Sequence, residues 1–338
     1  MTEAAFPLLG TAFIMLCVLP ACAMVAKVGL VLLERDEAGG LLHGLDLRYV
    51  LLTSSSVLPI AWFLSAGLHQ AESGKSVLCF LEHEATLCFE PGFFVAALAV
   101  AVLVACFCTL SHPRAVRVAS SDVASELMRR LEQLLARAPA LADLRGRLVV
   151  TDAPGFALAT YGLLRPKVFV GTSFAANLSD EMLASALGHE REHVRALDPL
   201  RYWVLQLALG VNPVGRALLE PHAARWRAAR EAHCDREAVL AGAAPLPLAD
   251  AIVRAARPRA HEAVALGARD TTLLKLRIGM LLAFAEEPPA RCCHRGVSAF
   301  PTAVALLLVV LALPHRTGTG VLDALHVGAE QALDYFSR

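Results

Sequence analysis

The sequence has few charged residues and no excess of either sign. Asp, Glu, Lys and Arg make up only 18% of its 338 residues, and the formal net charge is zero. Nucleic-acid binding needs a concentrated basic face, so this balance predicts no nucleic-acid partner. Hydrophobic residues make up 56% of the chain, more than a water-soluble globular domain usually carries. We therefore expect much of the chain to lie in a lipid bilayer.

Four stretches lack charged side chains over the length that a helix needs to cross a bilayer, about 20 residues. The first stretch is preceded by Glu3 and by no Lys or Arg, whereas a cleaved secretion signal starts with basic residues. We interpret all four as membrane-spanning helices: Phe6–Ala26, Tyr49–Leu68, Gly92–Ser111 and Gly296–Pro314.

Lys and Arg next to the spans predict the orientation, because short cytoplasmic loops are enriched in basic residues. By this rule the segment His69–Pro91, which contains four Glu and a single Lys, lies outside. The N-terminus is then also outside the cell's inner (plasma) membrane, and residues 115–295 are in the cytoplasm. Basic residues flank the spans on that inner side at Arg35, Arg48, Arg114, Arg117, Arg291 and Arg295.

This topology predicts one membrane bundle interrupted by one domain. We expect a bundle of three spans at 1–112, a cytoplasmic domain at 113–295, a fourth span at 296–314 and a short extracytoplasmic tail at 315–338. Cys79 and Cys88 share the outside loop, where a disulfide and two free thiols are both open.

Within the cytoplasmic domain, the pattern of apolar residues predicts helices and a small sheet. Ser121–Ala138 carries leucines at helical spacing, which is typical of an amphipathic helix. Arg147–Thr151 and Lys167–Gly171 are short β-type runs separated by turn-forming residues. Ser179 followed by two acidic residues indicates a helix start, and that helix should continue to about Leu197. The expected fold class is a mainly α membrane protein (α+β).

The helix from Ser179 contains an H-E-x-x-H motif at His189–His193. Because a helix turns once in 3.6 residues, His189 and His193 project from one face and can ligate a single zinc ion. Glu190 beside them can take a proton from the attacking water and later give it to the leaving amine. The motif also occurs in unrelated proteins, so an exposed charged helix is the alternative.

A catalytic zinc ion held by two His still lacks one protein ligand, which a Glu on a second helix often supplies. Glu231 lies 38 residues after His193, in the stretch Ala223–Leu240 of helix-forming composition. Asp235 follows Glu231 by one helical turn and could accept a hydrogen bond from a ligand His. We therefore predict Glu231 as the third ligand.

Other residues near the motif have more than one interpretation. His233 and Cys234 are rival ligands, but they point to other faces of the helix if Glu231 faces the metal. Asp198 could orient the end of the metal helix, cap it or form a surface ion pair. Tyr161 and His261 are candidates for stabilising the oxyanion, and a structural role is the alternative for each.

The apolar run Tyr202–Gly215 decides whether such a site can form. If it crossed the membrane, Glu231 would lie on the opposite side from His189 and His193. The run is short for a span and is broken by Asn212-Pro213. We expect residues near 202–215 to form a re-entrant or interfacial element, with the site close to the inner membrane surface.

Several segments match one family pattern in order: Gly162–Pro166, Leu178–Glu181, the H-E-x-x-H motif, Val194–Arg195, Asp198–Leu200, Asn212–Pro213, Glu231–Asp235 and Lys275–Ile278. Together they resemble the membrane-embedded gluzincin metallopeptidases of the BlaR/MecR signal-transducer type. The resemblance implies one Zn²⁺ per chain, the ligands His189, His193 and Glu231, and Glu190 as general base. It also implies a protein substrate such as a transcriptional repressor, bound as an added strand beside Lys167–Gly171.

The chain departs from these β-lactam sensors after the last span. Their penicillin-binding domain has no counterpart in His315–Arg338, and the sequence contains no Ser-x-x-Lys acylation motif. We expect a protease module for signal-regulated proteolysis, activated by a separate sensor partner or by the Cys79–Cys88 loop. The alternatives are a heat-shock-type membrane quality-control protease and a non-catalytic membrane scaffold or receptor.

Overall fold

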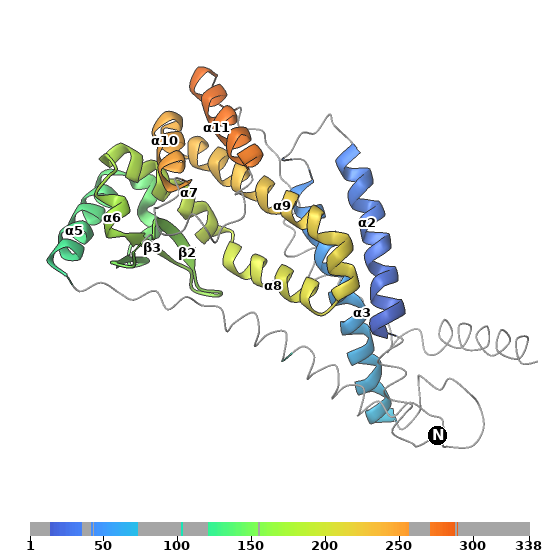
Figure 1. The fold of residues 1–338 in the computed structure, drawn as a ribbon. Helices are drawn as coiled ribbons and strands as arrows, with labels where there is room; N and C mark the ends of the chain where they lie inside the picture. Colours follow the sequence, from blue (N-terminus) through green and yellow to red (C-terminus); the bar gives the residue numbers. More distant parts are fainter. Residues whose placement is uncertain are drawn as a thin grey trace, which may run out of the picture. The chain divides into compact units, whose positions relative to one another are not determined.

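The computed structural model describes residues 14–35, 44–73, 121–154, 156–256 and 271–287, with single positions 42, 103 and 289 (Figure 1). These residues divide into two compact units. The first unit holds the described residues up to Leu103 together with 204–224, and the second holds 121–203 and 225–289. The predicted spans Gly92–Ser111, apart from Leu103, and Gly296–Pro314 lie outside the described residues, as do Cys79, Cys88, His261 and the C-terminal tail.

One helix of the first unit is long and apolar enough to cross a membrane. A π-helical turn, η1 (Ile14–Val18), leads into α2 (Leu19–Arg35), and the stretch Leu16–Arg35 has a mean hydropathy of 2.3. Large apolar side chains such as Met24 and Val25 are exposed on it. Its length and composition fit a membrane span, and a signal sequence near the N-terminus passes the same test. No other helix among the described residues meets this criterion.

The helix α3 (Leu45–Ser73) encloses the second predicted span, Tyr49–Leu68, and packs against α2. A Cβ at Gly29 of α2 would lie 3.3 Å from a methyl group of Leu51, so the absent side chain allows the two helices to approach. Thr53 donates its hydroxyl to the Tyr49 carbonyl at 2.9 Å, which satisfies this buried polar group within the helix. The arrangement with four spans stays a prediction.

The predicted helix break at Asn212-Pro213 is confirmed by a hairpin of two helices. The helices α8 (Asp198–Gly210) and α9 (Pro213–Leu240) are joined by Val211 and Asn212. Asn212 Oδ1 accepts a hydrogen bond from Gly215 N at 2.7 Å and caps α9, whose first residue is a proline that has no N–H to satisfy. The helix α9 begins ten residues earlier than predicted. A re-entrant or interfacial position of residues 202–215 stays a prediction.

The second unit contains a three-stranded sheet of β1 (Leu148–Thr151), β2 (Leu158–Tyr161) and β3 (Lys167–Gly171). The strand order is β1-β3-β2, with β1 parallel and β2 antiparallel to β3. Both predicted strands are therefore present, but β2 was not predicted. The expected free edge at Lys167–Gly171 is wrong, because β3 is paired on both sides and β1 and β2 form the two edges.

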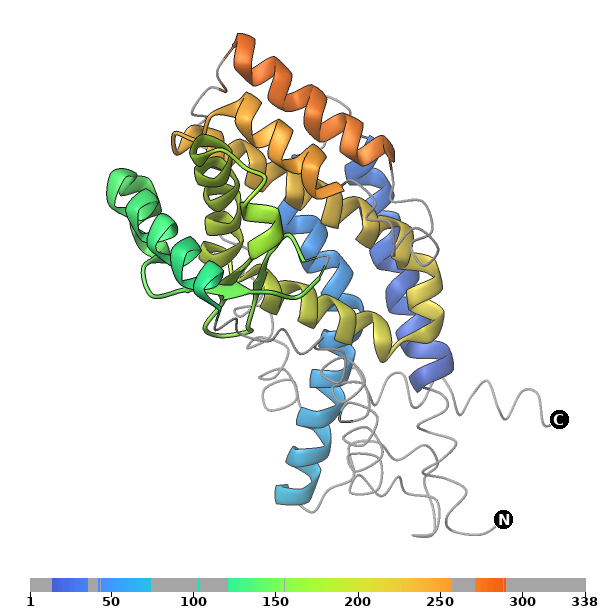
Figure 2. The same ribbon diagram turned by 60° about the vertical axis from the view of Figure 1, so that its left-hand side comes forward.

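The sheet shares one apolar core with α5 (Asp122–Arg137), the 3-10 helix η3 (Pro139–Leu144), α6 (Thr172–Ala175) and α7 (Asp180–Arg195) (Figure 2). The helix α5 confirms the predicted amphipathic helix, and Ser121 caps it. Each fully buried Leu side chain contributes roughly 1.5–3 kcal/mol of burial free energy, which holds α7 firmly on the sheet. The core includes Leu127, Leu131, Leu134, Leu144, Val168, Val170, Leu183 and Leu187.

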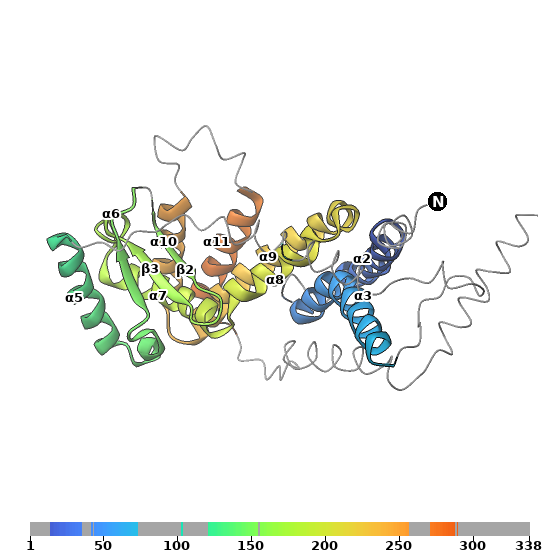
Figure 3. The ribbon, with the colours of Figure 1, turned by 90° about the horizontal axis from the view of Figure 1, so that it is seen from below.

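Two further helices cover α7 on its other side. The helix α10 (Pro245–Ala256) packs against α7, and α11 (Thr271–Glu286) packs against α10 (Figure 3). Leu281 is the one fully buried side chain of α11 among those that the structure describes. It belongs to a small apolar cluster with Ala238, Leu248 and Ala249, which Val239, Ile278 and Phe284 border.

Candidate metal centre

The helix α7 carries the H-E-x-x-H motif and starts where the sequence predicts. Ser179 Oγ accepts a hydrogen bond from the α7 backbone at 3.2 Å, and two acidic residues occupy the first turn. The helix ends at Arg195, and Leu197 then adopts a left-handed backbone conformation with φ 54°. This turn reverses the chain, so that α8 starts at Asp198.

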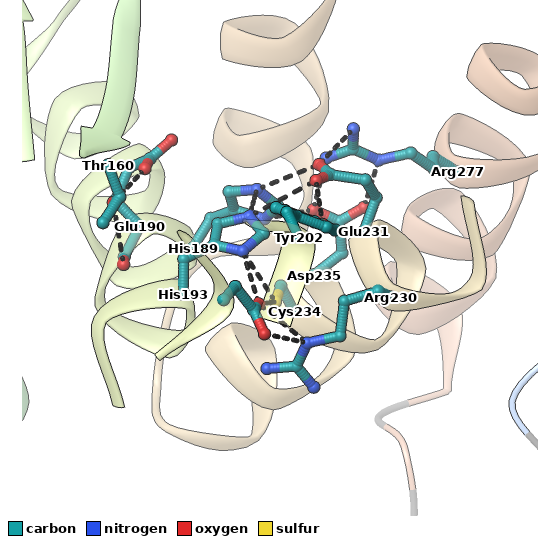
Figure 4. A network of polar contacts seen from close by, with 11 residues as sticks. Thr160, His189, Glu190, His193, Tyr202, Arg230, Glu231, Cys234, Asp235 and Arg277 are labelled. Atoms are coloured by element: carbon teal, nitrogen blue, oxygen red, sulfur yellow. Dashed lines mark hydrogen bonds and ion pairs between the residues drawn. The ribbon is translucent and has the colours of Figure 1, made fainter. Parts of the chain in front are cut away.

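The three predicted ligands converge on one point (Figure 4). His189 Nε2 and His193 Nε2 lie 3.1 Å apart. From α9, Glu231 brings Oε2 to 3.4 Å from His189 Nε2 and Oε1 to 3.5 Å from His193 Nε2. Both His side chains are buried, and Glu231 is half-buried.

The geometry of this group fits a metal ion. Donor atoms bound tetrahedrally to zinc at about 2.0–2.1 Å lie about 3.3–3.4 Å from one another. The separations of His189 Nε2 from His193 Nε2, 3.1 Å, and from Glu231 Oε2, 3.4 Å, are close to that value. The other oxygen of the same carboxylate, Oε1, lies 3.5 Å from His193 Nε2. Each ring also places its Nδ1 beside a carboxylate, which keeps the proton on Nδ1 and leaves a lone pair on Nε2. The two Nε2 atoms, 3.1 Å apart, can share one cation, either a proton on one ring or a metal ion between them, so the group could hold a metal ion.

His189 is held from behind by a chain of charged groups. Its Nδ1 lies 2.7 Å from Asp235 Oδ1, and Asp235 is 0% exposed. Arg277 of α11 donates to both oxygens of Asp235, from Nε at 2.6 Å and from Nη2 at 2.8 Å. It also donates from Nη1 to Glu231 Oε2 at 3.1 Å. Asp235 thus lies beside a ligand His, whereas Arg277 was not predicted to take part.

His193 has a matching chain on its other side. Its Nδ1 lies 2.7 Å from Asp198 Oδ2, and Asp198 is 0% exposed. Arg230 Nε donates to the two oxygens of Asp198 at 2.9 and 2.7 Å. The alternative of a surface ion pair for Asp198 is therefore wrong, because the turn at Leu197 folds the carboxylate inward, where Arg230 supplies the buried counter-charge.

The charges of this cluster shift the pKa values of its members. Burial lowers the pKa of His189, but the Asp235 carboxylate and hydrogen bonds to Asp235 and Glu231 outweigh burial and raise that pKa to about 10. Burial raises the pKa of Glu231, but the hydrogen bond with His189 and the charges of His193, His189 and Arg277 hold it well below its usual range. A bound metal ion would replace the proton of His189 as the positive charge at this point.

Glu190 lines the same cavity as the metal-binding group. Thr160 of β2 donates its hydroxyl to Glu190 Oε2 at 2.6 Å, and Glu190 is 7% exposed. The cavity has a volume of about 260 Å³, and His189, Glu231 and Arg277 also line it. The rest of its wall is mostly apolar and includes Leu158, Phe174, Leu248, Ala251, Ile252 and Leu274. The Glu190 carboxylate and two residues of the group that could hold a metal ion, His189 and Glu231, therefore line one apolar cavity.

Cys234 was expected to point to another face of α9 than Glu231, and this expectation is wrong. Its Sγ lies 3.6 Å from His193 Nδ1 and 3.7 Å from Asp198 Oδ2. Residues three apart on a helix are neighbours, which brings Cys234 into the cluster that Glu231 enters. A second group of converging ligand atoms comes from His193, Asp198 and Cys234, beside the group of His189, His193 and Glu231, and His233 belongs to neither group among the described residues.

Tyr202 is a residue of the site that sequence reasoning missed. Its hydroxyl donates to Glu231 Oε1 at 3.3 Å, and its ring packs edge-on against Trp226. Tyr202 begins the apolar run Tyr202–Gly215, which was predicted to be re-entrant or interfacial and was assigned no residue of the site. Tyr161, a predicted oxyanion donor, lies at the end of β2, is 46% exposed and packs against Phe169 with ring centroids 5.6 Å apart.

Comparisons with known proteins return no match. No protein-family model, no curated protein and no solved structure matches this chain. The resemblance to the membrane gluzincins stays a prediction. The geometry itself offers two imidazoles and a carboxylate that could hold a metal ion, and the Glu190 carboxylate lines the cavity onto which His189 and Glu231 open.

Proposed function

We propose that the chain is a zinc-dependent metalloendopeptidase of the membrane that hydrolyses peptide bonds in a cytoplasmic or membrane-associated protein. The observation that carries this proposal is the convergence of His189, His193 and Glu231 at 3.1–3.5 Å. Glu190 supports it further, because this carboxylate lines the same cavity as the ligands His189 and Glu231. Two His and one carboxylate, with a fourth position left open, are a ligand set of catalytic zinc sites.

The donor set favours zinc over other common divalent metals. Imidazole nitrogens and one carboxylate at tetrahedral separations suit zinc, whereas calcium takes six to eight oxygen ligands and magnesium requires an octahedron of oxygens. When bound, zinc polarises a carbonyl and activates water for attack at neutral pH.

Glu190 acts as the general base and then as the general acid. Its carboxylate takes a proton from the attacking water and delivers it to the leaving amine. Thr160 binds Oε2 at 2.6 Å, which fixes the carboxylate and leaves Oε1 for the proton transfer. Asp235 and Asp198 keep the ring protons of His189 and His193 on Nδ1, so that both Nε2 atoms stay available as ligands.

The substrate binds as an added strand along β2 rather than along β3. The strand β2 is an edge of the sheet, and Thr160 connects it to Glu190. A peptide paired with this edge would bring one of its carbonyl groups to the base and one of its side chains to the cavity. The apolar wall of the cavity favours an apolar side chain at that position.

The proposal includes the predicted membrane topology and regulation. Leu16–Arg35 is a candidate span with exposed apolar side chains, and the distribution of Lys and Arg favours an external N-terminus and a cytoplasmic metal domain. The substrate class is a regulatory protein such as a transcriptional repressor, cut in response to a separate sensor partner.

Glu190→Gln tests this function. The full chain is purified in detergent beside Glu181→Gln, a control that makes the same change at an exposed position of α7. Bound zinc, cleavage of the chain itself and cleavage of a repressor encoded nearby are then measured. We expect one zinc per chain in all three proteins and a loss of cleavage of about 10²–10⁴-fold in Glu190→Gln alone.

Four other outcomes would contradict the proposal or one part of it. A protein that purifies without zinc and does not bind added zinc has no such centre. Cleavage that survives Glu190→Gln removes the assigned base. Stoichiometric zinc without hydrolysis of any candidate protein favours the non-catalytic scaffold, and many cuts in misfolded membrane proteins favour a quality-control protease.

A further inference from the structure

Arg277 connects the metal group to a helix that carries none of its ligands. Its guanidinium bonds both oxygens of Asp235 and one oxygen of Glu231, at 2.6, 2.8 and 3.1 Å. A planar guanidinium has five N–H donors in a fixed arrangement, so one orientation of Arg277 sets the positions of two carboxylates at once. One of these carboxylates is a ligand, and the other holds the ligand His189.

Arg230 also supports a carboxylate of the centre, but it belongs to the helix that carries the ligand Glu231. It bonds Asp198 and so supports His193, but it lies on α9 directly before Glu231. Its position therefore follows from the same helix that carries the ligand. Arg277 comes from α11, so its contacts with Glu231 and Asp235 depend on how α11 docks.

The docking of α11 is shallow. Leu281 is its one fully buried side chain among those described, and it packs in a small cluster with Leu248 of α10. Leu276 and Leu282 of the same helix are 43% and 50% exposed. Among the described residues, the helix docks through Leu281 and the partly buried Ile278 and Phe284, while Arg277 reaches the metal group.

We propose that Arg277 is a positioning residue of the metal centre, and that the docking of α11 therefore sets the affinity of the centre for its metal. This inference rests on the proposed binding of a metal ion by His189, His193 and Glu231. A displaced α11 withdraws Arg277, and Glu231 and Asp235 then lose their common support.

Two effects of removing Arg277 oppose each other, and the structure indicates which is larger. Loss of a nearby positive charge favours a bound cation. However, Asp235 is 0% exposed and would be left buried without the guanidinium, and Glu231 would keep Tyr202 as its remaining donor outside the His pair. Loss of such a supporting partner typically weakens metal binding about 10–100-fold, so we expect weaker binding.

The test measures metal affinity in the full chain in detergent. Zn²⁺ dissociation constants are obtained by competition with a chromophoric chelator, and the visible absorption of bound Co²⁺ reports the coordination geometry. Arg277→Met should weaken Zn²⁺ binding about 10–100-fold and change the Co²⁺ spectrum. Arg277→Lys should restore part of the affinity, because Lys keeps the charge without the fork that bridges two carboxylates.

Two further variants separate docking from charge. Lys275→Met removes the same charge from an exposed position of α11 and should bind Zn²⁺ like the unmodified chain. Leu281→Ala touches no ligand but weakens the docking of α11, so it should lower the Zn²⁺ affinity as well. Equal or tighter binding in Arg277→Met overturns the proposal. Should that variant fail to fold by circular dichroism, unchanged affinity in both Arg277→Lys and Leu281→Ala overturns it instead.

His189→Ala distinguishes this failure from failure of the proposed function. If His189→Ala binds Zn²⁺ as tightly as the unmodified chain, the metal is elsewhere and both proposals fall. If His189→Ala loses Zn²⁺ while the Arg277 and Leu281 variants keep full affinity, the metal centre stands and only the role of Arg277 and α11 is refuted.

Discussion

The affinity for zinc should keep rising with pH above the range in which an ordinary His titrates. Burial lowers the pKa of His189, but the Asp235 carboxylate and the hydrogen bonds of the ring outweigh burial and raise this pKa to about 10. A metal ion that binds Nε2 at neutral pH must displace a proton from this ring. Because the raised pKa favours the protonated ring, most of His189 is protonated at neutral pH. Lowering the pH increases the competition from protons and weakens zinc binding, and raising the pH strengthens zinc binding.

The size of this effect separates it from ordinary titration. A His with a pKa of about 6.5 is mostly neutral above pH 7, so its titration raises metal affinity only about 1.3-fold from pH 7 to pH 8. A ring whose pKa lies well above 8 raises the affinity about tenfold over the same interval. The two cases differ enough to be resolved by competition with a chelator whose own protonation is corrected for.

Asp235→Asn supplies the decisive comparison. This variant removes the carboxylate charge that raises the pKa of His189, so its affinity should level off above about pH 7. Asp250→Asn makes the same change at an exposed ion pair of α10 and should keep the steep pH dependence. A Zn²⁺ affinity that is already level between pH 7 and pH 8 in the unmodified chain would refute the reasoning.

Two further predictions concern the cavity and the core. Ala255→Phe narrows the cavity from an exposed position of α10, so cleavage of peptides with a large apolar side chain should fall at least about tenfold while Zn²⁺ affinity stays unchanged. An equal loss for all peptides in a kinetic series would contradict the assigned role of the cavity. Leu187→Ala removes a 0% exposed side chain that α7 itself contributes to the apolar core, and should cost about 2–5 kcal/mol of unfolding free energy. Chemical denaturation of the metal-free protein checks this value, and a change below about 1 kcal/mol would count against tight packing under α7.

Local sequence signals predicted the metal helix well. Ser179 and the acids after it mark its start, and the spacing of His189 and His193 follows from helical geometry alone. Glu231 was predicted from its place in a downstream stretch of helix-forming composition, and Asp235 from its position one helical turn after Glu231. Asn212-Pro213 marked the break between α8 and α9, since proline at the first position of a helix is a strong local signal.

The remaining features depend on packing between distant segments. The strand β2 is only four residues long and is recognised as a strand by its pairing with β3. Asp198 points inward because Leu197 before it adopts a left-handed backbone conformation. This conformation is uncommon in residues other than glycine, so the local sequence did not predict it. Arg277 enters the centre through the docking of α11, and its charge alone does not distinguish it from other basic residues of the chain.

The contacts between α8 and α9 have a consequence for the design of smaller proteins. The chain leaves the second unit after Trp203 and returns at Arg225, and the rings of Tyr202 and Trp226 lie 5.7 Å apart at these two points. The ion pair between Asp198 of α8 and Arg230 of α9 also connects these two segments, on the side of the metal centre. Residues 204–224 therefore form an insertion from the first unit, and Tyr202 and Trp226, close to its two ends, are in contact. A short flexible linker in their place would leave the metal centre intact and allow it to be isolated from the helices of the first unit.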